Sequence, residues 1–528
     1  MPKVLVADSL APQGIEILRQ AEGIEVVDSP GLSPGDLLTA ITDIDALVIR
    51  SGTKVTADVI EAAPNLSVVG RAGIGVDNVD IAAATQRGIV VMNTPGGNTV
   101  TTAEHALALL VSLARHIPQA TASMKSGRWE KKQFVGVELY NRTLGVLGLG
   151  NIGRIVADRA RGLGMKVVAF DPFLSNEAAL KLDVELLPLD ALLERADAIS
   201  VHVPRTKDTA GMLGREAFAK VKPGVLLVNA ARGGIVDESA LLEALDSGAV
   251  GGAGLDVFEE EPVPSDHPLV AHERVVCTPH LGASTEQAQL NVAVAIAEQV
   301  RDFLLQGVVH NGVNVPSISR ELAARIRPYL ELGEKLGRFQ GQLAHGSIDQ
   351  IEVEYSGEAA NLAVAPITVA VLKGLLESVN EQVNMVNAPV VAQEHGIRVI
   401  ESKASRSADF ASAITTRVKG LSDRMIVGAI FQDQQPRIVR IDDFMLEAIP
   451  EGPTLLILNR DQPGVVGTVG TILGDAGLNI SRMQLALQLE RGEAAMLVNL
   501  ASVPPAEVLR SLRELPNVIS AELLELGP

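Results

Sequence analysis

The sequence has little thiol chemistry available and no membrane-spanning run. Its 528 residues include a single cysteine, Cys277, so no disulfide can form within the chain, and we expect a reducing compartment. No stretch of about 18 or more consecutive apolar residues occurs, which argues against a helix that crosses a membrane. The first residues, MPKVLVADSL, enter a strand pattern without the features of a secretory signal. Together these absences predict a cytoplasmic protein.

Positive charge is also scarce. Lys and Arg number 45 against 64 Asp and Glu, which gives a formal net charge of -19. Such an excess of negative charge disfavours binding to nucleic acid or to an anionic membrane surface. If the substrate is an anion, its site must be basic against this background. No His, Cys or acidic residues have the spacing typical of a metal site, so we expect no metal.

The residues that are present predict a globular protein of several domains. The chain is 47% hydrophobic and 21% charged, an ordinary composition, and its length corresponds to about three or four domains. In residues 1–98, apolar runs rich in β-branched residues recur about every 20 residues, which leaves room for a helix between them. These runs are KVLVAD, IEVVD, DALVIR, LSVVGR and IVVMNT. The pattern predicts a parallel, doubly wound α/β sheet.

Two long helical stretches enclose a second α/β pattern. One is TVTTAEHALALLVSLARH and the other is ASTEQAQLNVAVAIAEQVRDFLLQG. We predict an α/β fold of two doubly wound Rossmann-like domains, one inserted in the other. The substrate-binding domain comprises 1–98 and 285–318, and residues 99–284 form the inserted nucleotide-binding domain. A cleft between two such domains is the usual place for a ligand.

Capping signals predict where the two long helices begin and end. Thr101 and Glu104 have the spacing of a capping box, and Ser284 and Gln287 have the same spacing at the second helix. Gly307 is placed to end the second helix.

The remainder of the chain predicts two further domains. Residues 319–452 mix helical and short strand patterns and contain no catalytic motif, so we interpret them as an α+β intervening domain. Residues 453–528 follow the order strand, helix, strand, strand, helix, strand. This order is typical of a ferredoxin-like βαββαβ fold.

The stretch GVLGLGNIGRIVADRARGLGMKVVAFD, residues 145–171, has the features of a dinucleotide-binding site. Gly148, Gly150 and Gly153 form G-x-G-x-x-G between a strand and a helix, so that the pyrophosphate can lie at the helix N-terminus. Asp171 ends the next strand, where an acid binds the ribose hydroxyls and repels a 2′-phosphate, which favours NAD. The alternative is an ordinary strand-to-helix turn that binds nothing.

Three residues in later stretches are candidates for catalysis. Arg232 in NAARGGIVDE and His280 in CTPHLGAST each follow an apolar strand pattern, and Glu261 in GLDVFEEEP lies just beyond another. A histidine can take the proton of an alcohol, a carboxylate can fix its tautomer, and an arginine can hold a substrate carboxylate. The alternative for all three is a structural or surface role.

In combination and order, GVLGLGNIGR, NAARGGIVDE, GLDVFEEEP and TPHLGAST make the first 318 residues resemble the D-isomer-specific 2-hydroxyacid dehydrogenases. RSGTKVT, RAGIGVDNVD and NTPGGNTVTTAEH are most similar to the family members that act on 3-phospho-D-glycerate. The C-terminal half resembles their long form, which has an intervening domain followed by an ACT domain. The resemblance therefore implies an NAD-dependent enzyme of phosphorylated serine synthesis.

The resemblance also implies a role for each matching residue. Arg232 binds the carboxylate and keto oxygen of the substrate, His280 is the general acid and base, and Glu261 is its partner. The residues implied to contact NAD, besides the three glycines, are Asn151, Ile152, Asp171, Ala230 and Asp256. The residues implied to hold phosphate or carboxylate are Arg50, Ser51, Lys54 and Arg71, with Lys131 reaching the site of a neighbouring subunit. The other histidines are interpreted as structural.

The C-terminal resemblance implies regulation. In ACT domains, small amino acids bind at paired interfaces, and the matching positions here are Asn459, Asp461 and Asn479. The resemblance thus implies L-serine as an effector and a homotetramer as the assembly. Two alternatives stay open: a dehydrogenase of another D-2-hydroxy acid, and a catalytically idle regulator that senses NAD.

Overall fold

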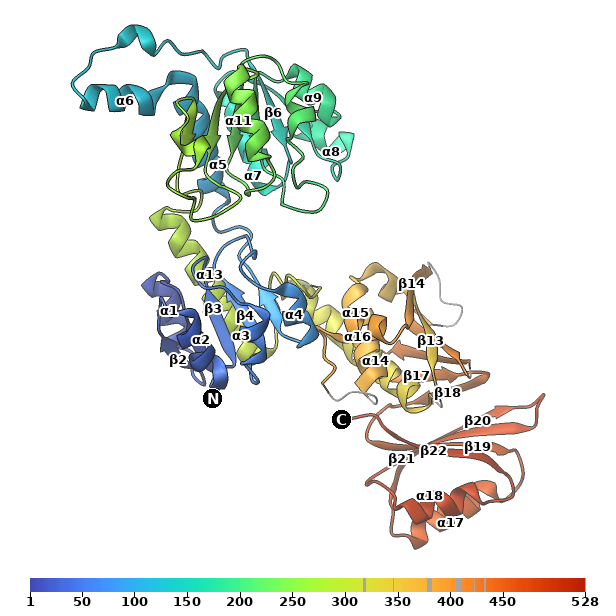
Figure 1. Ribbon diagram of the computed structural model, residues 1–528. Coiled ribbons are helices and arrows are strands. Elements are labelled where there is room, and N and C mark those ends of the chain that lie inside the picture. The colour runs from blue at the N-terminus through green and yellow to red at the C-terminus, as the bar shows by residue number, and fades with distance from the viewer. Residues whose placement is uncertain are drawn as a thin grey trace.

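The computed structural model describes residues 1–316, 320–344, 346–377, 382–404, 410–421, 423–431 and 434–527. In these residues the chain forms four β-sheets with flanking helices (Figure 1). Each sheet is the centre of one unit: the first α/β unit, the inserted α/β unit, the intervening unit and the C-terminal unit.

The first α/β unit contains a parallel five-stranded sheet in the order β2-β1-β3-β4-β5. The strands are β1 Lys3–Val6, β2 Glu25–Asp28, β3 Ala46–Ile49, β4 Val68–Arg71 and β5 Val90–Met92. The helices between them are α1 Pro12–Arg19, α2 Pro34–Ala40, η1 Ile41–Asp43, α3 Ala57–Glu61 and α4 Ile81–Gln86. All four residues of β3 are buried, as expected for a strand covered on both faces. The predicted doubly wound sheet is confirmed.

The inserted α/β unit contains a parallel seven-stranded sheet in the order β12-β11-β10-β9-β6-β7-β8. Its strands are β6 Thr143–Leu147, β7 Lys166–Phe170, β8 Glu185–Leu186, β9 Ala198–Val201, β10 Val225–Asn229, β11 Val250–Leu255 and β12 Val275–Cys277. Its shorter helices are α6 Ile117–Lys125, η2 Lys131–Gln133, α7 Asn151–Gly162, α8 Asn176–Lys181, α9 Leu189–Arg195, α10 Arg215–Phe218, α11 Glu238–Ser247 and α12 Pro268–Ala271.

Two long helices connect these units, α5 Thr99–Arg115 and α13 Glu286–Gln306 (Figure 1). α5 packs on α7 and the second sheet, whereas α13 returns to pack on α1 and β4 of the first. At Gly70 the approach is so close that an added Cβ would lie 2.7 Å from Val300 and 2.9 Å from Ile296. The second α/β unit is therefore inserted in the first, as the fold class predicted.

The predicted capping box of α5 is wrong, although the helix begins at Thr99 as the predicted stretch does. Asn98, not Thr101, is at the N-cap position. The carbonyl of Asn98 accepts the backbone N–H and the hydroxyl of Thr102, at 3.0 and 2.9 Å. Thr101 therefore lies inside the first turn, where its side chain cannot cap the helix.

At α13 the predicted start is off by one residue. Thr285, not Ser284, is the N-cap, and its hydroxyl accepts the N–H of Ala288 at 3.2 Å. The predicted end is confirmed, because Gly307 has a φ of 68° and forms the C-cap.

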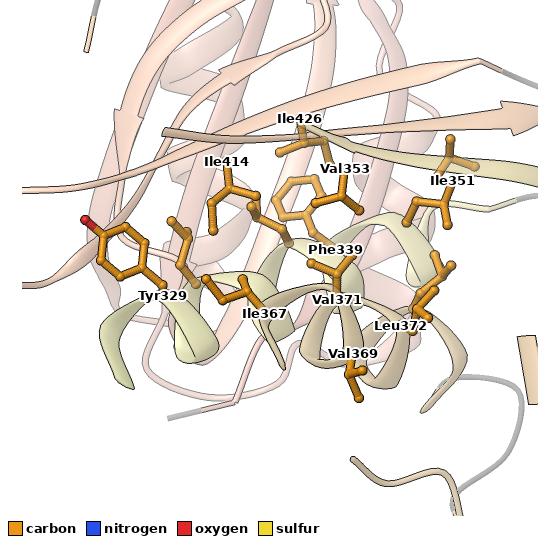
Figure 2. Close-up of a cluster of buried hydrophobic side chains, with 14 of the residues drawn as sticks. Tyr329, Phe339, Ile351, Val353, Ile367, Val369, Val371, Leu372, Ile414 and Ile426 are labelled. Atoms are coloured by element: carbon orange, nitrogen blue, oxygen red, sulfur yellow. The ribbon is translucent and has the colours of Figure 1, made fainter. Parts of the chain in front are cut away.

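The intervening unit is a six-stranded mixed sheet in the order β14-β13-β15-β16-β17-β18, covered by helices. Its strands are β13 Ile348–Gly357, β14 Arg398–Ala404, β15 Ser412–Gly420, β16 Arg424–Ile430, β17 Pro436–Ile441 and β18 Phe444–Ala448. Its helices are α14 Arg320–Gln342, η3 Glu358–Asn361, α15 Ala365–Glu377 and α16 Ala388–Glu394. Figure 2 shows its core, where Phe339 and Val371 of the helices meet Val353 and Ile426 of the sheet. The sequence patterns predicted short strands here, but the strands are longer, and β13 has ten residues.

The C-terminal unit has the predicted βαββαβ order and an antiparallel sheet in the order β20-β21-β19-β22. Its elements are β19 Pro453–Arg460, α17 Val465–Asp475, β20 Ile480–Gln488, β21 Glu493–Leu500, α18 Ala506–Arg513 and β22 Val518–Glu525. Leu455 packs in the core below the two helices, whereas Leu456 packs in the core of the intervening unit. Successive residues of β19 thus bury opposite faces of the sheet.

None of the helices in the described ranges combines the length and the apolarity that crossing a bilayer requires.

Candidate active site

The glycine loop after β6 leaves room for an anion at the start of α7. Gly148 has a φ of 92°, and a Cβ there would lie 2.9 Å from the carbonyl oxygen of His202. A Cβ on Gly153 would lie 1.9 Å from the oxygen of Gly148, so helix and strand pack closely. A Cβ on Gly150 would meet nothing within 4 Å. Gly150 is the N-cap of α7, so this open space lies at the helix N-terminus, which suits a pyrophosphate.

Asp171 lies beside this loop, directly after β7. One carboxylate oxygen accepts the N–H of Leu149 at 2.9 Å and the other accepts the N–H of Phe173 at 2.9 Å. The acid therefore fixes the glycine loop as well as presenting negative charge next to it. Such a carboxylate can accept ribose hydroxyls and repels a 2′-phosphate, so the residues of this loop fit NAD.

Asp256 is buried beneath the histidine loop. Its carboxylate accepts the N–H groups of Leu281 and Gly282 at 2.7 and 2.8 Å and the hydroxyl of Thr278 at 2.6 Å. Burial opposes ionisation, but hydrogen bonds from His105, Thr278 and Leu281 outweigh it and lower the pKa of Asp256. Asp256 is thus engaged mainly with the loop that carries the catalytic candidate.

His105 is a contact that the sequence did not suggest. Its Nε2 lies 3.1 Å from Asp256 and 3.0 Å from Thr278. The residue lies on α5, and its sequence pattern indicates only a structural role. Its partners show that it helps to orient the carboxylate under the histidine loop.

His280 and Glu261 form a direct pair. Nδ1 of His280 lies 2.7 Å from Oε2 of Glu261, and the second oxygen of Glu261 accepts the N–H of Phe258 at 3.1 Å. The backbone of His280 has a φ of 53°, an uncommon conformation that the N–H bonds of this loop to Asp256 hold in place. With Nδ1 engaged, Nε2 is the atom available to exchange a proton with a substrate.

The charges of this pair depend on each other. The hydrogen bond that His280 donates to Glu261, opposed by burial, raises the pKa of His280 above its ordinary value. Burial disfavours the charge on Glu261, yet the bonds from His280 and Phe258 keep its pKa below the usual range. Such an arrangement suits a general base held by an ionised orienting acid.

Arg232 links the two α/β units. It follows β10, and its Nε donates to Asp77 of the first unit at 2.7 Å. Its Nη1 donates to the carbonyl of Ala231 at 2.7 Å, and Asn229 holds the turn by donating to the carbonyl of Arg232 at 3.0 Å. A Cβ on Gly75 would lie 1.9 Å from Nη2 of Arg232, so only glycine leaves room for this guanidinium.

Arg232, Arg71 and Arg50 gather where the two units meet. Burial, with the charges of Arg232 and Arg50, lowers the pKa of Arg71 to about 10, so Arg71 remains charged at neutral pH. A Cβ on Gly73 would lie 1.5 Å from Nη1 of Arg71, so this glycine also makes room for an arginine. The charge of Arg232 also acts on His280, where it lowers the pKa, so the candidate base lies within electrostatic reach of this cluster.

The remaining predicted residues lie in four places. Ser51 and Lys54 are exposed on the loop after β3, next to Arg50, and Ala230 is buried directly after β10. Asn151 and Ile152 open α7 at the glycine loop. Lys131 lies in η2, on the arm around α6 that projects away from the junction of the α/β units (Figure 1). Lys131 is therefore not brought to the site within one chain.

In the part of the chain that the structure describes, no group of three or more His, Cys, Asp or Glu could hold a metal ion. The described site thus consists of a dinucleotide loop, an acid–base pair and a cluster of arginines at the C-terminal ends of parallel strands.

Comparison with known families agrees with this description of the site. The sequence model of the D-isomer specific 2-hydroxyacid dehydrogenase NAD binding domain matches residues 107–282. The D-3-phosphoglycerate dehydrogenase intervening domain matches residues 325–442, and the ACT domain matches residues 454–517. The inserted unit is thus an NAD-binding domain.

Similarity to full-length proteins decides the family. The chain is 43% identical over its whole length to D-3-phosphoglycerate dehydrogenase of Synechocystis sp., and the match covers 95% of that protein. It is 44% identical to the enzyme of the same name from Methanocaldococcus jannaschii, where the match covers 100% of both chains. The chain belongs to the D-3-phosphoglycerate dehydrogenase family. The resemblance found in the motifs is therefore confirmed.

Solved structures match the two α/β units. An NAD-dependent formate dehydrogenase from Staphylococcus aureus, solved in complex with NAD, is 28% identical with a TM-score of 0.54. It covers 60% of this chain and 100% of its own. The TT0316 protein from Thermus thermophilus is 37% identical, with a TM-score of 0.55 over 59% of this chain and 99% of its own. These structures thus correspond to about three fifths of the chain, and the intervening and C-terminal units are additional to them.

Proposed function

We propose that the protein oxidises 3-phospho-D-glycerate at C2 with NAD⁺ to 3-phosphohydroxypyruvate, the first step of phosphorylated L-serine synthesis. The observation that carries this proposal is the gathering of Arg50, Arg71 and Arg232 beside the His280–Glu261 pair. A substrate with a carboxylate at one end and a phosphate at the other needs this basic surface in an otherwise acidic protein. The family members named above support the same substrate.

In the proposed reaction each residue has one task. Arg232 binds the carboxylate of the substrate through the part of its guanidinium that Asp77 and Ala231 leave open. Arg71 and the Arg50–Lys54 loop hold the phosphate. Nε2 of His280 takes the proton of the C2 hydroxyl while the hydrogen on C2 leaves as hydride. NAD⁺ at the glycine loop supplies the hydride acceptor, and the C2–O bond becomes a carbonyl.

Glu261 sets the protonation of the base. Its carboxylate holds the tautomer in which Nδ1 carries hydrogen, and it stabilises the imidazolium that forms when Nε2 accepts the proton. In the reverse direction the same imidazolium returns the proton to the carbonyl oxygen. Reduction of other 2-oxo acids, such as 2-oxoglutarate, uses the same groups and is an additional activity to measure.

A pH profile tests the pair. Oxidation requires neutral His280, so kcat/KM should fall as pH decreases through the raised pKa of this residue. Replacing Glu261 by Gln removes the charge that raises this pKa, so the falling limb should move to lower pH. The rate at the plateau should drop about tenfold or more, because the imidazolium loses its partner. The pH dependence of NADH formation measures both effects.

The control for this profile is Glu260→Gln, which removes the same charge from the neighbouring exposed residue. Its profile should coincide with that of the unmodified protein. Equal shifts in both variants would show a general effect of surface charge and would contradict the assigned pairing.

Steady-state rates test the substrate. NADH formation should be much faster with 3-phospho-D-glycerate than with D-glycerate or D-lactate. Equal rates would favour a dehydrogenase of another 2-hydroxy acid, and no NADH with any of them would favour a regulator that only senses NAD. The retained His280, Glu261 and Arg232 argue for catalysis.

We also propose L-serine as an effector at the C-terminal unit. Oδ1 of Asn459 is buried near the end of β19 without a hydrogen-bond partner. Asp461, two residues later, and Asn479, directly before β20, are exposed. An unpaired buried acceptor suits an ammonium or hydroxyl group. Repeating the assay with millimolar L-serine should show inhibition; an unchanged rate would remove this proposal.

A homotetramer is the proposed assembly. The arm around α6 exposes apolar side chains, among them Trp129 at 80%, Val135 at 76% and Tyr140 at 66%. Such a surface is typical of a contact with another chain, and a contact there would let Lys131 approach a neighbouring site. Light scattering should give the mass of four chains, and a monomer mass would contradict the proposal.

A further inference from the structure

The loop Arg50–Lys54 is held by a carboxylate that the reaction itself does not use. Asp8 follows β1, and its Oδ2 accepts the backbone N–H of Arg50 at 2.6 Å and that of Thr53 at 3.1 Å. Its Oδ1 accepts the hydroxyl of Thr53 at 2.9 Å. Three donors of a five-residue loop therefore converge on one side chain. Charge-assisted bonds of this kind are stronger than those between neutral groups.

An amide holds the same loop through its carbonyl groups. Nδ2 of Asn78 donates to the carbonyl of Arg50 at 2.7 Å and to that of Thr53 at 2.6 Å. Asn78 comes directly after Asp77, the partner of Arg232. The N–H groups of the loop are thus bound by Asp8 and its carbonyl groups by Asn78, which belong to the loops that follow β1 and β4.

Packing leaves this loop little freedom. A Cβ on Gly52 would lie 2.7 Å from Oδ1 of Asp8, so no side chain can be present there without displacing the carboxylate. The side chains of Ser51 and Lys54, in contrast, are exposed. The loop therefore has a fixed backbone and free polar ends, as expected of a surface that must present groups to a ligand.

We propose that Asp8 and Asn78 are positioning residues that fix the Arg50–Lys54 loop and thereby set the preference for a phosphorylated over an unphosphorylated 2-hydroxy acid. This inference rests on the proposed function. A loop whose backbone is ordered before binding loses less entropy when the phosphate arrives. In the proposed binding mode Arg232 holds the carboxylate of the substrate and His280 acts at C2, so both steps should be insensitive to this loop.

Simple electrostatics predicts the opposite result. Asp8 is a negative charge next to Arg50 and Lys54, so removing it would strengthen the binding of an anion if charge alone mattered. Asn78 carries no charge, and its removal should change the electrostatics little. Weaker phosphate binding in both variants therefore distinguishes a positioning role from a charge effect.

The experiment compares Asp8→Asn and Asn78→Ala in the full-length protein. Each should raise KM for 3-phospho-D-glycerate about tenfold with kcat within about twofold, because one or two hydrogen bonds that order the loop are lost. The kcat/KM for D-glycerate should change little, so the ratio between the two substrates should fall about tenfold. Competitive inhibition by inorganic phosphate should weaken by a similar factor.

The matched control is Asp45→Asn. The carboxylate of Asp45 also joins β1 and β3, since it accepts the N–H of Lys3 at 2.7 Å, but it lies at the opposite end of these strands. Its removal should leave the substrate ratio unchanged. A general loss of stability would lower all rates alike in the control and in both variants.

The outcomes separate this inference from the proposed function. If the unmodified protein shows no preference for 3-phospho-D-glycerate, the proposed function fails, and inhibition by inorganic phosphate still tests the loop. If that preference is present but Asp8→Asn strengthens phosphate binding, or if both substrates lose equally, the positioning role is overturned. If one of the two variants unfolds, the other still tests the proposal. Asp8→Asn weakens the bonds to the N–H groups of the loop, whereas Asn78→Ala removes the bonds to its carbonyl groups.

Discussion

Replacing His280 by Ala is expected to lower kcat for the oxidation of 3-phospho-D-glycerate by about 10²-fold or more, because the general base is lost. Glu261 engages Nδ1 of this residue, so Nε2 is the ring nitrogen that remains available to act as the base. KM for NAD⁺ should stay within about twofold, since the glycine loop is separate. Stopped-flow and steady-state NADH formation measure the loss.

The backbone at this position calls for a second variant. His280 has a φ of 53°, which asparagine tolerates better than most residues. His280→Asn should therefore fold with the native loop and lose activity to the same degree. His395→Ala, at an exposed histidine of the intervening unit, is the control and should retain full activity. Unchanged turnover in the His280 variants would favour a regulator without catalysis.

Arg232→Lys is expected to lower kcat/KM for 3-phospho-D-glycerate by about 10²-fold or more, although the charge is kept. The guanidinium donates from Nε to Asp77 and from Nη1 to Ala231 and still has hydrogens for the substrate. An ammonium group has three donors and no planar fork, so it cannot satisfy all these acceptors in one geometry. The losses should appear in both KM and kcat, because the same group orients C2.

The control for this substitution is Arg215→Lys. Arg215 forms a fork on Glu243, at 2.7 Å from Nε and 2.6 Å from Nη2, on the exposed surface of the same unit. Losing that fork should have almost no kinetic effect, since exposed ion pairs contribute little. If Arg232→Lys is as active as this control, Arg232 does not bind the substrate.

The intervening unit contacts the first α/β unit directly, at the edge of its sheet opposite the arginines. Asn384 donates to the carbonyl of Gly88 at 3.0 Å, and Asn387 donates to that of Gln86 at 3.5 Å. Gly88 precedes β5 in the same sheet whose other strands end at Arg50 and Arg71. The contact gives a physical connection between the C-terminal half and the sheet that carries the arginines.

Much of the fold could be predicted from local patterns. The strands of both α/β units, the glycine loop and the βαββαβ order depend on the period of apolar residues and on glycines with positive φ, which neighbours in sequence decide. The same local signals failed at helix starts, where Asn98 and Thr285 took the places predicted for Thr101 and Ser284. The loop that precedes a helix fixes its first turn, and that loop is shaped by tertiary contacts.

The sequence by itself determined the two interleaved α/β patterns, the NAD-binding loop and the candidates Arg232, Glu261 and His280. Only the tertiary structure decided which residues hold the site in place. Asp8 binds Arg50, which lies 42 residues away in the sequence. His105 binds Asp256 across 151 residues, and Asp77 binds Arg232 across 155. A single polar residue at a strand end has the same local pattern whether it faces water or a partner. The order in which parallel strands lie side by side brings these pairs together, and that order is a property of the whole fold.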